Sequence, residues 1–338
     1  MKLNLSLIAI VAFCAILVVG CRKGPTVETV TLYTSVDEPF AKMVIAQFEK
    51  QSGLKVALIT DSEAGKTTGL VQRIVAEAQT GRVRADVFWS SEVFNTILLA
   101  RQGHLAPYDS PAAADIPARY RDPQKRWSGT SVRARVLAFD PQRASRADVP
   151  AAWGQLSSAK HAKDVAIANP LFGTTRGHIG AMHAVWGPER TKAFLLGLRD
   201  GGAQVVDGNS ASVRAVIAGQ TLFAATDSDD VYVARKSGAS LDMVFPDMGD
   251  GGTLLIPCTV ALLAGAPSPE NGRKLVDFLL SAEVEELLAR SDSGNIPVRV
   301  VLREKMNMPW PAESKVTFEA AADAMDAAVG QARDILLR

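Results

Sequence analysis

The sequence predicts an α/β protein of two lobes with a binding cleft between them. Short apolar segments alternate with segments of helical period along almost the whole chain, which is typical of parallel sheets covered by helices. The length of 338 residues exceeds what one compact core usually holds. Polar strand-to-helix turns occur in both halves of the chain. The net charge of +1, from 37 basic and 36 acidic residues, offers no electrostatic footprint for nucleic acid.

The N-terminus predicts export. An apolar run over residues 7–20 is too short to span a bilayer comfortably. It ends in Gly20-Cys21, which resembles the lipobox of bacterial lipoproteins. We therefore expect residues 1–20 to be a signal peptide and Cys21 to carry the lipid anchor, with residues 21–28 as a tether. An ordinary secretory signal with a coincidental Cys is the alternative.

Cysteine usage agrees with this interpretation. Cys14 leaves with the signal peptide and Cys21 carries lipid, so Cys258 is the remaining thiol. No intrachain disulfide is then possible, and stability must come from the core. Cys258 lies within an apolar run over 254–263, which predicts a buried thiol.

Residues 29–130 predict most of the first lobe. Strands are expected at 29–33, 54–60 and 86–89, each followed by a helix. Pro39 suits the first turn of the first helix and Gly53 suits its end. Residues 104–127 are expected to be irregular, and the strand that follows them, over 136–139, marks the first crossing between lobes.

Residues 131–253 predict the second lobe, and 254–338 a return to the first. The expected strands of the second lobe cover 164–168, 205–206, 222–225 and 243–245. Helices are expected between them, and residues 246–253 form the second linker. The returning strand covers 254–263, and the remaining helices are expected at 269–280, 282–290 and 314–336.

Small polar residues follow six of the predicted strands, where each strand passes into a helix. The carboxyl ends of strands in open parallel sheets bind ligands, and helix N-termini favour anions there. Any one such turn is more often a helix cap. Three turns in each lobe nevertheless favour a shared cleft. They are Tyr33-Thr34-Ser35, Asp61-Ser62, Ser90-Ser91-Glu92, Thr174-Thr175, Asn209-Ser210 and Thr226 to Asp230.

Enzyme signatures are weak in this chain. Asp227-Ser228-Asp229 matches the short D-x-D pattern of metal-dependent glycosyltransferases, which occurs often by chance. No G-x-S-x-G or H-E-x-x-H motif occurs. His178 and His183 lie five residues apart, off the spacing that points two zinc ligands the same way. We therefore expect no enzyme, with a glycosyltransferase-like activity as a remote alternative. A purely structural or signalling lipoprotein is another, but it would need no convergent polar turns.

Several motifs together resemble the bacterial extracellular solute-binding proteins of the ferric-iron-binding type. The resemblance covers nearly the whole mature chain in order. It implies the type II periplasmic-binding-protein fold, with two α/β lobes that close on a ligand, and a partnership with the permease and ATPase of an ATP-binding-cassette importer. The motifs are Tyr33-Thr34-Ser35, residues 85–89, residues 133–137, residues 172–175, residues 208–210 and residues 256–262.

The ligand that the resemblance implies is ferric iron with a synergistic anion, but the metal ligands of the family are only partly present. Iron-binding members use a His in the first turn, a Glu after the third strand and an adjacent Tyr pair. The first turn here has no His, Glu92 follows the third strand, and Asp229-Asp230 stand in place of the Tyr pair. Carboxylates also suit divalent ions and ammonium groups. Hydroxyls and amides with Arg133 suit an oxyanion such as phosphate or phosphonate, and an aminophosphonate-like zwitterion would use both sets of groups. Another cation, an anionic solute and a zwitterionic solute are therefore the open alternatives to iron.

The predicted site combines the polar turns with the positions that match the family. Ser131 and Asn209 lie where the resemblance places the anion contacts, with Arg135 nearby. We expect no cofactor apart from the transported ligand, and a location in the periplasm or cell envelope. The predicted ligand-binding residues are Tyr33, Thr34, Ser35, Ser62, Trp89, Ser91, Ser131, Arg133, Thr174, Thr175, Asn209, Asp227 and Tyr232, and the predicted metal ligands are Glu92, Asp229 and Asp230.

Overall fold

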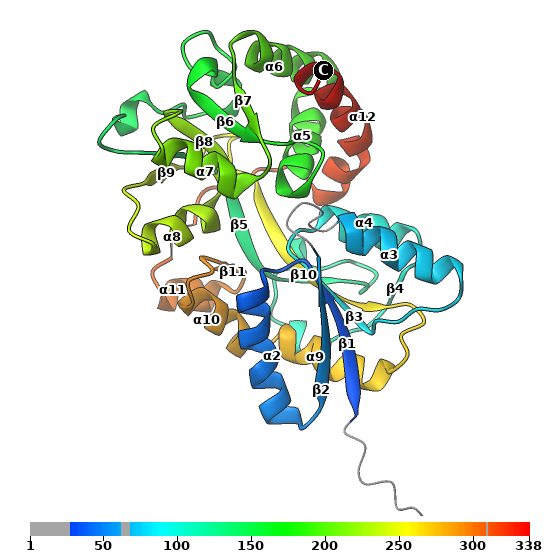
Figure 1. Ribbon diagram of the computed structural model, residues 1–338. Coiled ribbons are helices and arrows are strands. Elements are labelled where there is room, and N and C mark those ends of the chain that lie inside the picture. The colour runs from blue at the N-terminus through cyan, green and yellow to red at the C-terminus, as the bar shows by residue number, and fades with distance from the viewer. Residues whose placement is uncertain (1–27, 62–67, 309) are drawn as a thin grey trace, which may run out of the picture.

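The computed structural model describes residues 28–61, 68–308 and 310–338 (Figure 1). The predicted signal peptide, the lipidation site Cys21 and the predicted site residue Ser62 lie outside this part of the chain. None of the helices described combines the length and the hydrophobicity needed to cross a bilayer.

A mixed sheet runs through both lobes and organises the fold. Its strands follow the order β2-β1-β3-β10-β5-β8-β6-β7, with β4, β9 and β11 paired at the sides. Parallel pairs join β1 to β2 and β3 in one lobe, and β6 to β7 and β8 in the other. The strands are β1 Thr29–Thr34, β2 Lys55–Thr60, β3 Val87–Ser90, β4 Leu105–Ala106, β5 Ser128–Phe139, β6 Val165–Ala168, β7 Gln204–Val206, β8 Phe223–Asp227, β9 Asp242–Val244, β10 Leu255–Leu263 and β11 Ile296–Pro297.

Strand β5 joins the two half-sheets. Its first half pairs antiparallel with β10, from Ser128 to Ala134, and its second half pairs with β8, from Arg135 to Phe139. The sequence predicted this strand only over 136–139, and its polar lead-in belongs to it as well. β5 and β10 pass together between the lobes in Figure 1. The junction therefore places Arg133 and Arg135 between the lobes.

Helices cover both half-sheets, and their starts follow the strand ends. Six of the helices described carry Pro or an acidic residue in the first turn. The helices predicted from 269 and from 282 begin at those residues, and the one predicted from 314 begins at 318. The helices are α2 Glu38–Ser52, α3 Thr68–Gln79, α4 Phe94–Arg101, α5 Gly173–Trp186, α6 Pro188–Asp200, α7 Asn209–Ile217, α8 Ser228–Lys236, α9 Pro269–Leu279, α10 Ala282–Arg290, α11 Val300–Lys305 and α12 Phe318–Leu336.

The last helix lies on a different lobe from the one predicted. The sequence prediction assigned all of 254–338 to the first lobe. In the structure α12 packs mainly against α5 and α6 of the second lobe, and it also touches α4 of the first (Figure 1). Its buried face carries Ala321, Ala328 and Ala332, and small side chains allow helices to approach closely. The chain thus crosses between the lobes a third time before α12.

Candidate functional site

A polar cavity of about 160 Å³ lies between the lobes, beside the junction strand β5. The second lobe supplies most of its wall, from the turns that precede α5, α7 and α8. The first lobe contributes the start of α2 and the turn after β3. The lining residues are Asp37, Ser91, Arg133, Ala168, Asn169, Phe172, Gly173, Thr174, Thr175, Asp207, Gly208, Asn209, Ser210, Asp229 and Asp230.

Two helices present N-termini without side-chain caps to this cavity. Phe172 precedes α5 and Gly208 precedes α7, and neither side chain can accept a hydrogen bond from the first turn. The first backbone N–H groups of a helix have no partner within the helix and carry partial positive charge. Two such ends that meet at one cavity form a favourable environment for an anionic group.

The start of α8 forms the opposite, acidic part of the wall. Asp227 and Asp230 make a capping box, in which Asp230 Oδ2 accepts from the Thr226 hydroxyl at 2.9 Å and from the Asp227 amide at 3.4 Å. Asp229 Oδ1 is buried and has no hydrogen-bond partner. Burial raises the pKa of Asp229, and the carboxylates of Asp230 and Asp227 add to the rise while Arg133 opposes it. Burial likewise raises the pKa of Asp230, with Asp227 adding to that rise.

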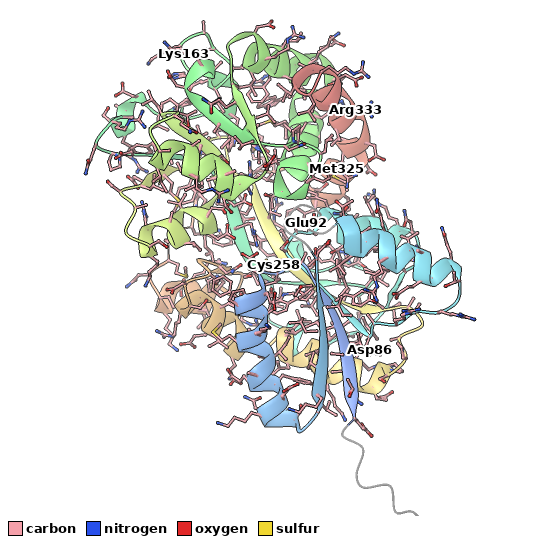
Figure 2. The ribbon with its side chains drawn as sticks, viewed as in Figure 1. Asp86, Glu92, Lys163, Cys258, Met325 and Arg333 are labelled. Atoms are coloured by element: carbon pink, nitrogen blue, oxygen red, sulfur yellow. The ribbon has the colours of Figure 1, made fainter. Side chains whose placement is uncertain are left out.

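Arg133 is the positive charge of the cavity. Its Nη1 lies 3.0 Å from Asp229 Oδ2 and 3.9 Å from Asp227 Oδ2. Its Nη2 contacts the buried Cys258 Sγ at 3.7 Å. Figure 2 places Cys258 at the junction of the lobes. The Arg133 Nε atom has no hydrogen-bond partner. The cavity therefore holds both a donor and an acceptor whose hydrogen-bonding capacity is unused.

Behind the cavity, Arg135 and Asp227 form a fully buried ion pair at 2.8 Å. Asp227 Oδ2 also accepts from the Thr174 hydroxyl at 2.5 Å and from Asn209 Nδ2 at 2.8 Å. Arg135 Nε donates to His178 Nδ1 at 3.3 Å. Burial lowers the pKa of His178 well below its usual value, and the Arg135 charge adds to the effect, so this ring stays neutral and accepts. The network holds Thr174 and Asn209 in place at the cavity wall.

Seven of the residues predicted to bind the ligand or a metal line this cavity. They come from both lobes, as the pattern of polar turns predicts. Ser35 lies directly behind the wall, where its hydroxyl accepts from the Ser91 amide at 2.9 Å. The seven are Ser91, Arg133, Thr174, Thr175, Asn209, Asp229 and Asp230.

Three predicted residues on the first lobe face its own core. Tyr33 is buried and donates to Glu77 Oε1 at 2.7 Å. The Thr34 hydroxyl donates to the Trp89 carbonyl at 2.8 Å. Trp89 itself is buried in the sheet. None of the three lines the cavity.

The remaining predicted residues are also occupied elsewhere. The Ser131 hydroxyl pairs with Asn295 at 3.1 Å, and Tyr232 packs against Gly294. Asp227 is enclosed by the network around Arg135. Glu92 caps α4, since its Oε2 accepts from the Phe94 amide at 2.6 Å, and burial raises its pKa to about 7 (Figure 2).

Other lining residues escaped the sequence prediction, although the same rule reaches them. Asn169 follows β6 and Asp207 follows β7, both at strand ends that pass into helices. Phe172 precedes α5. Ser210, from the predicted polar turn Asn209-Ser210, lies in the first turn of α7 and lines the cavity as that turn predicted. Asp37, just before α2, also lines the cavity.

Three carboxylates could hold a cation. Oxygens of Asp227, Asp229 and Asp230 lie within 4.8 Å of one another. Most of these oxygens already accept hydrogen bonds, and Arg133 lies beside two of them. The residues described around the cavity include no Tyr and no His. Few carboxylate oxygens around the cavity are therefore free to coordinate a metal ion.

Comparison with known proteins agrees with this geometry. Residues 85–323 match the family described as bacterial extracellular solute-binding protein. The "Fe(3+)-binding periplasmic protein" of Serratia marcescens is 26% identical over 89% of this chain and 88% of its own. A "Putative 2-aminoethylphosphonate-binding periplasmic protein" of Salmonella typhi is 26% identical over 78% and 75%. The structure of a ferric binding protein from Campylobacter jejuni superimposes with a TM-score of 0.81, at 19% identity, over 91% of this chain and 99% of that one.

These similarities confirm the predicted fold class, two α/β lobes of the type II periplasmic-binding-protein architecture. The relatives are binding proteins and not enzymes, as the sequence predicted. More than half of the chain falls within the family match. The chain therefore belongs to the bacterial extracellular solute-binding proteins.

Proposed function

We propose that this protein is the substrate-binding component of an ABC-type importer and that it captures a small zwitterionic phosphonate or phosphate ester. The ligand would occupy the polar cavity between the lobes and pass to a membrane permease driven by its ATPase. The lipobox-like Gly20-Cys21 supports a receptor tethered to the cell envelope through lipid on Cys21.

The observation that carries the proposal is the separation of two kinds of polar group in one cavity. Uncapped N-termini of α5 and α7 favour an anionic head. Asp229, with one unpartnered carboxylate oxygen, favours an ammonium group. Asp207, Asp229 and Asp230 bring carboxyl groups to the same cavity as the guanidinium of Arg133, so a ligand with both an anionic and a cationic group has a partner for each. A zwitterion satisfies both sides, and the relative named for 2-aminoethylphosphonate supports this class.

Ferric iron with a synergistic anion is the second candidate, because three carboxylates lie close together and several relatives are named for iron. The resemblance in sequence favoured iron. The proposal places the zwitterion before iron because Arg133 lies within the carboxylate cluster and repels a metal ion. Three of the four described tyrosines are engaged elsewhere, since Tyr33, Tyr108 and Tyr120 donate to Glu77, Asp277 and Glu313. The fourth, Tyr232, packs against Gly294 and does not line the polar cavity.

The deciding experiment measures the thermal unfolding midpoint of the purified protein against a ligand panel. The panel contains 2-aminoethylphosphonate, phosphoethanolamine, inorganic phosphate, ethylamine, and Fe(III) with citrate or phosphate. A ligand that binds only the folded state raises the midpoint. We expect a shift with the two zwitterions and little with phosphate or ethylamine alone. A shift with Fe(III) only would replace the zwitterion by iron, and no shift with any solute would remove the support for a receptor of this class.

A further inference from the structure

A second cavity, of about 330 Å³, opens directly from the polar one. The two share Asp37, Arg133, Ser210, Asp229 and Asp230 in their walls. The start of α8 therefore stands between them, and a group bound to its carboxylates faces both spaces. The second cavity extends away from this wall between α2 of the first lobe and α7 and α8 of the second.

Apolar side chains from both lobes line the second cavity. Val36 and Phe40 face it from the first lobe, and Val213, Ile217 and Val233 from the second. Ile217 is 53% exposed and Val233 is 42% exposed. The described part of the chain exposes few large apolar side chains, and these two occur together at one cavity beside the polar site. Exposed apolar groups gathered in this way mark a binding surface.

The volumes of the two cavities also indicate that a ligand occupies both. Pockets for organic ligands usually measure about 300–1,000 Å³. The polar cavity alone, at about 160 Å³, has room for a compact charged head. Of these two cavities, the second, at about 330 Å³, falls within the usual range for organic ligands. The pair of cavities thus suits a ligand with a small polar head and a larger apolar part.

We infer that the natural ligand is an amine-substituted zwitterion whose apolar N-alkyl or N-aryl group occupies the second cavity. This inference rests on the proposed function and names its substrate class more closely. The phosphonate or phosphate end lies against the starts of α5 and α7. The ammonium lies at Asp229 and Asp230, on the shared wall. A substituent on the nitrogen then leads into the apolar space beside Phe40, Ile217 and Val233.

Isothermal titration calorimetry tests this with the protein purified in detergent from the envelope fraction. The two probes are 2-aminoethylphosphonate and its N-benzyl derivative, which keeps the positive charge as a secondary ammonium. Burial of the phenyl ring in the apolar cavity should tighten binding about tenfold.

A variant that fills the second cavity tests whether the gain in affinity from the benzyl group arises there. Val233→Trp should abolish the gain from the benzyl group and leave the affinity for 2-aminoethylphosphonate within about twofold. The matched control is Val301→Trp, at a valine 74% exposed on α11 outside both cavities, which should behave as the natural protein does.

The outcomes separate this inference from the proposed function. Binding of 2-aminoethylphosphonate with equal or weaker binding of the N-benzyl compound overturns the inference and leaves the proposed function standing. A gain that survives Val233→Trp also overturns it. Binding of the N-benzyl compound alone supports the inference and excludes the small zwitterion as ligand. Binding of neither compound overturns both.

Discussion

Arg133 and Arg135, two residues apart on β5, each pair with an aspartate of the second lobe, and the two pairs differ in how many of their polar atoms have hydrogen-bond partners. Arg135 and Asp227 are fully buried, and Thr174, Asn209 and His178 complete their hydrogen bonds. Arg133 and Asp229 are also paired, at 3.0 Å, but each keeps a polar atom without a partner.

This difference predicts a structural role for the Arg135–Asp227 pair and a ligand-binding role for the Arg133–Asp229 pair. A completed buried pair cannot accept a ligand without breaking its own bonds, so its role is to fix the neighbouring side chains. An incomplete pair at a cavity gains bonds when a ligand arrives. Changes to the first pair should therefore affect folding, and changes to the second should affect affinity.

Removal of Asp227 should have the largest effect. Asp227→Ala leaves the Arg135 guanidinium buried without a counter-charge, which should lower the free energy of unfolding by about 3–5 kcal/mol. Urea denaturation measures this. Asp229→Ala serves as the matched control and should cost less, because Arg133 keeps Asp227 at 3.9 Å as a counter-charge. Equal losses in the two variants would contradict the distinction between the pairs.

Asp229→Asn should affect ligand affinity strongly, although it should change stability little. It keeps the shape of the side chain but removes the charge that the ammonium requires. We expect the Kd for 2-aminoethylphosphonate to rise about 30- to 100-fold, about 2–3 kcal/mol, with little change in unfolding. Calorimetric titration measures it, and Asp292→Asn, at an exposed carboxylate outside the cavity, is the control. Unchanged affinity would remove Asp229 from the site.

Gly294→Ala tests whether the neighbouring loop holds Asp229 in place. A Cβ at Gly294 would lie 2.7 Å from Tyr232 Cβ and 3.0 Å from Asp229 Cα. The added methyl should displace the start of α8 and weaken binding about tenfold, at an overpacking cost of about 1–3 kcal/mol. Gly53→Ala is the control, because Gly53 also has a positive φ but nothing lies within 4 Å of its added Cβ. Similar affinities in both variants would show that the close approach is unimportant for binding.

The pH dependence should give the smallest effect. The pKa of Asp229 is raised in the folded protein, so the folded state holds more protons than the unfolded chain above about pH 4. Stability without ligand should therefore fall as the pH rises from 5 to 8. Affinity for an ammonium-bearing ligand should rise over the same range, since the carboxylate becomes charged. Asp229→Asn should make both dependences shallower, and part of each remains because burial also raises the pKa of Asp230 and Glu92. Slopes as steep as those of the natural protein would assign them to other groups.

The alternation of strands and helices was predictable because it depends on local periodicity, and so were several residues of the cavity. Thr174, Thr175 and Asn209 follow from the rule that polar strand ends meet at one edge of a sheet. The direction of Tyr33 was not predictable, since its partner Glu77 is 44 residues away. The enclosure of Asp227 depends equally on Arg135, 92 residues earlier in the chain.

Some side chains that the sequence analysis assigned to the ligand instead satisfy backbone groups nearby. Glu92 looks like a ligand in the sequence, yet its carboxylate caps the helix that begins two residues later. Helix α12 has an apolar face that would suit either lobe, and only the three-dimensional path of the chain decides which one it covers. Both cases turn on contacts that no local pattern of residues contains.

The position of Arg133 on the strand shared by both half-sheets has a mechanical consequence. A ligand that binds near the pivot of two rigid bodies exerts little leverage, but a small rotation there moves the distant rims through a large arc. The difference between an empty and a filled site would then be amplified at the surface farthest from the ligand. A permease could therefore recognise occupancy by the spacing of the two lobe tips alone, without touching the solute.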